Sequence, residues 1–211
     1  MSKLVKKAKV GALERFLASL GKRLMYRRAP KVTQLLVNLS YREIIRLLVE
    51  IHGSVEGALN AVFELALHAG PDFLNKWVED GHAIFSKYVG DHGLWIKSGY
   101  YSFTGDHITY IQYLPPEKVG EPHRVIWRLD KCFLCAGMAE DPTFPIKKED
   151  FGAHGWGTVI AGIFQATTKM INEYAGIEFT SRVREIKCLL RGDPYGEFMA
   201  EFYPKPVSKS L

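Results

Sequence analysis

The clearest secondary-structure pattern of the chain lies in GTVIAGIFQATTKMINEYAG (157–176), followed by IEFTSRVREIKCLLRGDPYGEFMAEFY (177–203). In the first part, apolar residues recur three and four positions apart, as at Ile160, Ile163 and Phe164, which predicts a helix with one buried face. Gly176 is the residue type that most often ends a helix in the left-handed conformation. The second part changes to β-branched and aromatic residues among charges, and its turn at 192–196 predicts a closing β-hairpin.

The closing hairpin carries the motif REIKC (184–188) and then RGDPYGEF (191–198). These residues resemble the terminal signature of the 4-vinyl reductase, or hydrocarbon-binding, domain family, which is related in fold to the small subunits of the TRAPP vesicle-tethering complex. The resemblance implies a twisted antiparallel sheet with helices packed on it, and a site for a small hydrophobic ligand. The second hairpin cysteine of that signature falls at Gly196, so the chain departs from the pattern there.

Composition places the chain among globular proteins, with 47% apolar and 24% charged residues. No apolar run has the length of a bilayer crossing, and the basic start lacks the apolar core of a signal peptide. The three cysteines are an odd number, which argues against a disulfide framework and favours a reducing compartment. We therefore predict a cytoplasmic protein.

Positive charge is concentrated at the N-terminus, where residues 1–31 hold ten Lys or Arg against the single acidic residue Glu14. We interpret 1–31 as a basic helical segment and 32–211 as a single α+β domain. A basic segment can bind nucleic acid or an anionic membrane surface. The interpretation that we favour is a surface helix from Lys3 to Met25 whose apolar residues pack inward, namely Leu4, Val5, Val10, Leu13, Phe16, Leu17 and Leu20.

The middle of the chain predicts helices followed by strands. Ser40 and Glu43 form a capping-box pattern for a helix that stops at Gly53, and Ser54 begins the next helix, which Gly70-Pro71-Asp72 is expected to break. From Leu94 the pattern favours a hairpin that turns at 104–107, then a third strand at 124–129 and a long loop at 136–155. Helices segregated from about four to five antiparallel strands define an α+β fold.

The cysteines form one candidate metal site. Cys132 and Cys135 have the two-residue spacing that can wrap a tetrahedral Zn²⁺. The resemblance adds Cys188, which matches the first hairpin cysteine of the family, and His154, which lies roughly where the family has a cysteine before the long helix. Zinc held by these four residues would staple the loop to the hairpin. Two alternatives stay open: three buried structural thiols, or a redox pair at 132–135.

Aromatic residues form a candidate ligand pocket. An aromatic-rich sheet face covered by the long helix, with the loop 136–155 as a gate, can enclose an apolar cavity with a few polar groups. Ordinary core packing is the alternative. The predicted lining residues are Phe103, Tyr110, Trp127, Phe151, Trp156 and Phe164.

The function that we predict is a sensor or carrier domain for a small hydrophobic molecule. A homodimeric TRAPP-like scaffold without a ligand is the second hypothesis. The third hypothesis is an enzyme, either a reductase or a hydrolase. The sequence shows no nucleotide-binding loop that would supply a hydride, so we favour a protein without catalytic activity.

Overall fold

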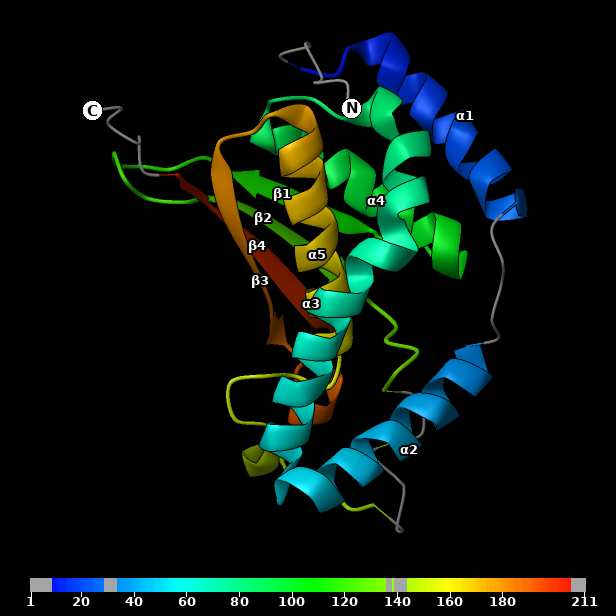
Figure 1. Ribbon diagram of the computed structural model, residues 1–211, viewed down its shortest axis with the longest axis vertical. Helices are drawn as coiled ribbons and strands as arrows, with labels where there is room; N and C mark the ends of the chain where they lie inside the picture. The colour runs from blue at the N-terminus through cyan, green and yellow to red at the C-terminus, as the bar shows by residue number, and fades with distance from the viewer. Residues whose placement is uncertain (1–8, 29–33, 136–137, 139–143, 206–211) are drawn as a thin grey trace.

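The computed structural model describes residues 9–28, 34–135, 138 and 144–205. These form an α+β fold in which helices pack on one face of a four-stranded antiparallel sheet of order β1-β2-β4-β3 (Figure 1). The helices are α1 (Ala12–Arg28), α2 (Gln34–His52), α3 (Val55–Asp80), α4 (His92–Thr104) and α5 (Thr158–Ala175). The strands are β1 (Tyr110–Leu114), β2 (His123–Leu129), β3 (Phe179–Lys187) and β4 (Gly196–Pro204). Short 3-10 turns are η1 (His82–Ile84), η2 (Val89–Asp91), η4 (Lys148–Phe151) and η5 (Leu189–Arg191).

The sheet has one apolar and one charged face, as strand alternation requires. The helix-facing side buries Trp127 of β2 and Phe198 and Phe202 of β4 completely. On the opposite face two glutamates of β4 lie among cations: Glu201 Oε2 is 3.1 Å from a guanidinium nitrogen of Arg184, and Glu197 bonds to Arg128. The predicted closing hairpin is confirmed, with η5 in its connection.

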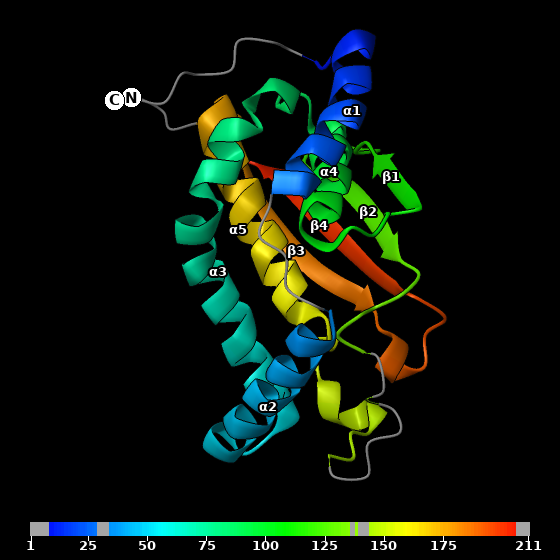
Figure 2. The same cartoon turned by 90° about the vertical axis from the view of Figure 1, so that its right-hand side faces the viewer.

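Helix α5 crosses the apolar face of the sheet, and α3 packs beside it (Figure 2). The two helices approach so closely that a Cβ on Gly162 would lie 2.8 Å from the Cβ of Ala66. The predicted helix end is confirmed at Gly176, which adopts the left-handed conformation with φ 65°. Burial between sheet and α3 explains why the apolar stripe of α5 was so clear in the sequence.

Two helix boundaries differ from the sequence prediction. Helix α2 begins at Gln34, so Ser40 lies inside it and caps nothing, because the chain before it is already helical. Helix α3 runs through Pro71 to Asp80 instead of breaking there. A proline removes one helical hydrogen bond, and the apolar surface that α3 buries against α5 compensates for it. The start of α3 is confirmed: the Ser54 hydroxyl accepts the N–H of Gly57 at 3.0 Å.

The hairpin predicted after Leu94 is wrong. Residues 92–104 form α4, and Gly105, with φ 78°, ends that helix instead of turning a hairpin. The buried residues Trp95, Ile96, Gly99 and Tyr100 have helical spacing, but their aromatic and β-branched character imitated a strand. Two strands therefore precede α5, not three: β1 confirms the second arm of the predicted hairpin, at 108–113, and β2 confirms the strand that was predicted at 124–129.

Helix α1 confirms a helix in the N-terminal segment, over Ala12–Arg28 where Lys3 to Met25 was predicted, but the predicted inward packing is wrong. Leu13, Phe16, Leu17 and Leu20 are 51–69% exposed, whereas Val10 is buried. Leu4 and Val5, which were predicted to pack inward with them, lie outside the described residues. The helix contacts α4 and η1 with its other side.

Candidate functional site: an apolar cavity and a thiol cluster

A cavity of about 270 Å³ lies among the helices. Its walls come from α3, α4 and α5, with Val37 of α2 and Phe133 of the loop after β2 closing it. The lining is mainly aromatic and aliphatic, so the site suits an apolar guest. The residues that line it are Val37, Leu74, Trp77, Trp95, Gly99, Tyr100, Phe103, Thr104, Phe133, Ile160, Ile163, Phe164 and Thr167.

Three hydrogen-bond donors of the cavity wall are buried without a partner among the described residues. They are the indole Nε1 atoms of Trp77 and Trp95 and the hydroxyl of Tyr100. Burial raises the pKa of Tyr100, with the nearby Cys132 adding to the effect, so its hydroxyl keeps its proton. A buried donor without an acceptor costs about 1–3 kcal/mol. Three donors that lack an acceptor among the described residues are thus carried by residues that line one cavity.

Of the six aromatic residues predicted from the sequence to line a pocket, Phe103 and Phe164 line this cavity. Trp127 lies behind the wall, where its ring meets Phe164 edge-on at 5.0 Å. Phe151 and Trp156 are fully buried core residues. Tyr110 is on the charged face of the sheet, with the Arg128 guanidinium 4.0 Å from its ring centroid.

The cavity therefore lies among helices instead of between α5 and the sheet. Sequence reasoning missed Trp77, which lies on α3, and it missed Trp95 and Tyr100 because it assigned 94–103 to a strand. The signal that could have found the last two was their helical spacing in α4. The predicted gate, 136–155, lies partly outside the described residues, and its described part, 138 and 144–155, does not line the cavity.

Cys188, which is far from the neighbouring Cys132 and Cys135 in the sequence, meets them in the fold. Cys132, Cys135 and Cys188 are buried free thiols. Hydrogen bonding from Cys135 lowers the pKa of Cys188 to about 6, and the backbone N–H of Trp156 also donates to its sulfur at 3.3 Å. Hydrogen bonding with Cys135 likewise lowers the pKa of Cys132, whereas the pKa of Cys135 itself is raised. The hydrogen bonds of the cluster thus favour the thiolate form of Cys188 and the protonated form of Cys135.

Glu185 shares this cluster. One carboxylate oxygen accepts the N–H of Gly157 at 2.7 Å, and the other, Oε1, is buried without a partner among the described residues. Burial raises the pKa of Glu185 well above its usual value, and the charges of Cys188 and Cys132 raise it further. A Cβ on Gly155 would collide with Oε2, so this glycine gives the carboxyl group its space.

Strand alternation puts Glu185 on the same buried face of β3 as Val183, and a register shift follows between Glu185 and Lys187. The next odd-numbered residue, Lys187, would share its face in a regular strand, yet its Nζ lies 3.3 Å from Glu197 on the charged face. A β-bulge re-aims side chains in this way. The bulge thus leaves Glu185 in the core and places Lys187, two residues later, on the charged face of the sheet.

His154, the fourth predicted metal ligand, has other partners. Its Nδ1 is 2.8 Å from the Thr158 hydroxyl, and its ring centroid lies 5.5 Å from that of Phe63. Glu185, which was not predicted as a ligand, accompanies the thiols instead. Within the described ranges, no group of three or more His, Cys, Asp or Glu is placed to hold a metal ion as it stands.

Comparison with solved structures identifies the fold. The chain is similar to trafficking protein particle complex subunit 3 from Naegleria fowleri, covalently bound to palmitic acid, with a TM-score of 0.59 and 13% identity over 82% of this chain and 98% of that one. It has a TRAPP-like fold. It is also similar to the phenol-responsive sensory domain of the transcription activator PoxR with phenol, with a TM-score of 0.51 and 14% identity over 82% of this chain and 76% of that one.

No protein-family model matches the chain, and no curated protein matches it significantly. The predicted relation in fold to small TRAPP subunits is confirmed, while membership of the 4-vinyl reductase family stays a prediction. In the described part of the chain, none of the helices combines the length and apolar character that a bilayer crossing requires.

Proposed function

We propose that this chain binds a small hydrophobic molecule in the cavity among α3, α4 and α5, and acts as a sensor or carrier of the hydrocarbon-binding type. The observation that carries the proposal is the combination of an apolar wall with donors of Trp77, Trp95 and Tyr100 that have no acceptor among the described residues. The two structural neighbours, one bound to palmitic acid and the other with phenol, support it.

Cavity size and polarity narrow the class of ligand. A cavity of about 150 Å³ lined by Leu, Ile and Phe holds one benzene ring, so about 270 Å³ suits a compact molecule of one or two rings. The donors require an acceptor on that molecule, such as a phenolic, carbonyl or ether oxygen. A pure hydrocarbon would leave all three donors unpaired.

The test is extraction of the purified protein with organic solvent and mass spectrometry, followed by titration of the emptied protein with phenol and with toluene. The fluorescence of Trp77 and Trp95 in the wall reports binding. We expect phenol to bind more tightly than toluene, and Ile163→Trp, at the cavity rim, to weaken it. Leu65→Trp, an exposed position on α3 outside the cavity, is the matched control. Equal affinity for both probes, or no effect of Ile163→Trp, would contradict the proposal.

We also propose a structural zinc at the thiol cluster, with Glu185 replacing His154 as the fourth ligand. Three thiolates and a carboxylate supply the four donors of a structural zinc site. Two observations support this donor set: Oε1 of Glu185 has no partner within the described part of the chain, and the pKa of Cys188 is lowered. Metal analysis of protein purified without added zinc tests it: we expect one equivalent, lost in Cys188→Ser and retained in His154→Ala. Metal-free wild-type protein would exclude the site.

A homodimeric scaffold is the second candidate function, favoured by the outer face of α2. Leu36, Ile44, Leu47 and Ile51 are 45–65% exposed there. The charges of this helix balance, with Arg42 and Arg46 against Glu43 and Glu50, so two copies would meet without net repulsion. Contiguous exposed apolar residues mark interaction surfaces. Light scattering tests it: we expect a dimer that Leu47→Glu converts to a monomer.

A further inference from the structure

Helix α1 turns its apolar residues away from the rest of the fold. Its exposed residues Leu13, Phe16, Leu17 and Leu20 follow the i, i+3, i+4, i+7 spacing of one apolar stripe. The side turned toward α4 and η1 carries small and polar residues, such as Ala18, Gly21 and Lys22, and Leu17 lies at the edge of the cavity between them. The fold thus presents the apolar stripe of α1 outward.

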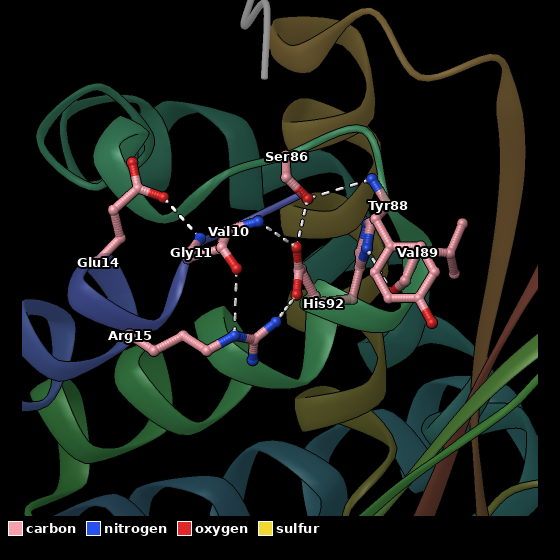
Figure 3. A network of polar contacts seen from close by, with 9 residues as sticks. Val10, Gly11, Glu14, Arg15, Ser86, Tyr88, Val89 and His92 are labelled. Carbon is pink, nitrogen blue, oxygen red and sulfur yellow. Dashed lines mark hydrogen bonds and ion pairs between the residues drawn. The ribbon is translucent and has the colours of Figure 1, made fainter. Parts of the chain in front are cut away.

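Specific contacts at both ends fix this orientation. Asp91, at the start of α4, pairs with Arg15 and accepts the backbone N–H of Val10 at 2.7 Å (Figure 3). At the other end, the ring of Tyr26 lies 5.2 Å from that of Tyr101 on α4. A rotation of α1 about its axis that buried the apolar stripe would break the contacts of Asp91 with Arg15 and Val10. It would also break the ring contact between Tyr26 and Tyr101.

The net positive charge of α1 indicates which class of partner binds its exposed apolar stripe. Between residues 9 and 28 the sequence has Lys9, Arg15, Lys22, Arg23, Arg27 and Arg28 against Glu14 alone. Glu14 accepts the N–H of Gly11 at 2.8 Å, and Arg15 is neutralised by Asp91. A second copy would bring basic helix against basic helix, which is unfavourable. Nucleic acid would use the cations but would leave the leucines and phenylalanine exposed.

We propose that α1 is an interfacial helix that docks this domain on an anionic lipid bilayer. Helices with an apolar face and a Lys/Arg-rich remainder lie in the plane of the membrane surface, with the apolar side chains among the acyl chains and the cations near the headgroups. The cations of α2, Arg42 and Arg46, are balanced by Glu43 and Glu50, so its apolar face lacks the net positive charge of α1, and its proposed occupant is a second copy of this chain. The two apolar faces are thus distinguished by charge.

The test is co-sedimentation of the full chain with vesicles of phosphatidylcholine alone or of phosphatidylcholine with phosphatidylserine. We expect binding to the anionic vesicles that weakens with added salt and that falls at least about tenfold in Leu13→Ser/Phe16→Ser/Leu17→Ser. Arg23→Gln should weaken binding about fivefold. The control Leu65→Ser/Val119→Ser removes exposed apolar side chains elsewhere and should bind as the wild type does. Because all these positions are exposed, circular dichroism should show unchanged folding.

Three results would overturn the proposal. The first is equal binding to neutral and anionic vesicles. The second is anionic-vesicle binding that survives the triple substitution. The third is a wild-type protein that does not bind vesicles and instead either binds RNA or changes its oligomeric state when the three residues are substituted. None of these readouts depends on a ligand in the cavity.

Discussion

The backbone N–H of Gly157 and the carboxylate of Glu185 meet at 2.7 Å, which ties the entry of α5 to β3 inside the core. This contact joins the two elements of the segment that was clearest in the sequence. It also gives a buried acid one partner and leaves its second oxygen with none in the described part of the chain.

Replacing this acid should change how stability depends on pH. The folded pKa of Glu185 is raised, first by burial, so the folded protein binds a proton that the unfolded chain releases above about pH 4.5. The stability that protonated Glu185 contributes is fully present below about pH 4.5 and is lost as pH rises through the raised pKa. We expect Glu185→Gln to gain stability relative to the wild type between pH 4.5 and 7.5, measured by urea unfolding with a chelator present. A stability difference that does not vary with pH would contradict this.

His92 should give the opposite pH dependence. Its ring is buried, with Nδ1 3.0 Å from the Val89 carbonyl and Nε2 3.1 Å from Asn172 Oδ1. Burial lowers its pKa to about 4 although both acceptors favour the charged ring. The unfolded chain therefore takes up the proton first, and stability should fall by about 3 kcal/mol as pH drops from 6.5 to 4.

Urea unfolding across that pH range checks the prediction for His92. His92→Gln should flatten the acid limb, whereas His82→Gln, at an exposed histidine, should keep the wild-type profile. An acid limb that is equally steep in both variants would assign the loss of stability to other groups.

Two glycines inside helices should respond to alanine with opposite signs. Gly162 of α5 lies against α3, where a Cβ would come within 2.8 Å of both the Ala66 Cβ and the Phe63 carbonyl oxygen. Gly162→Ala should cost about 1–3 kcal/mol of unfolding free energy through overpacking. Gly21 of α1 has open space around its Cβ position, so Gly21→Ala should gain about 0.5–1 kcal/mol. Thermal unfolding compares them; a loss at Gly21 equal to that at Gly162 would refute the packing argument.

Cys188 should contribute to stability as a hydrogen-bond acceptor. It is fully buried, and its sulfur accepts the N–H of Trp156 at 3.3 Å. Cys188→Ala would leave that N–H without an acceptor and should cost about 1–3 kcal/mol. Cys188→Ser keeps an acceptor and should lose less under the same urea titration in metal-free buffer. If the serine variant were the less stable of the two, Cys188 would stabilise the fold mainly through the volume of its sulfur and not through the hydrogen bond.

Local features of the sequence determined several parts of this fold. The apolar stripe of α5, the left-handed end at Gly176 and the Ser54 cap of α3 depend on residues a few positions apart. The turn at 192–196 likewise predicted the hairpin of β3 and β4. Such signals are readable because periodicity, caps and turns depend on backbone geometry within one or two turns of chain.

Only the tertiary structure decided which faces are buried and which groups meet. The aromatic residues of 94–103 suit a strand or a helix, and packing against Trp77 and Phe164 selects the helix. Likewise the amphipathic pattern of α1 does not specify which side turns inward; Asp91, 76 positions beyond Arg15, turns the apolar side out. The cavity, and the meeting of Glu185 with the thiols, depend on contacts between distant segments. The spacing of residues in the sequence does not indicate these contacts, because the packing of whole helices and strands determines which side chains are neighbours in the core.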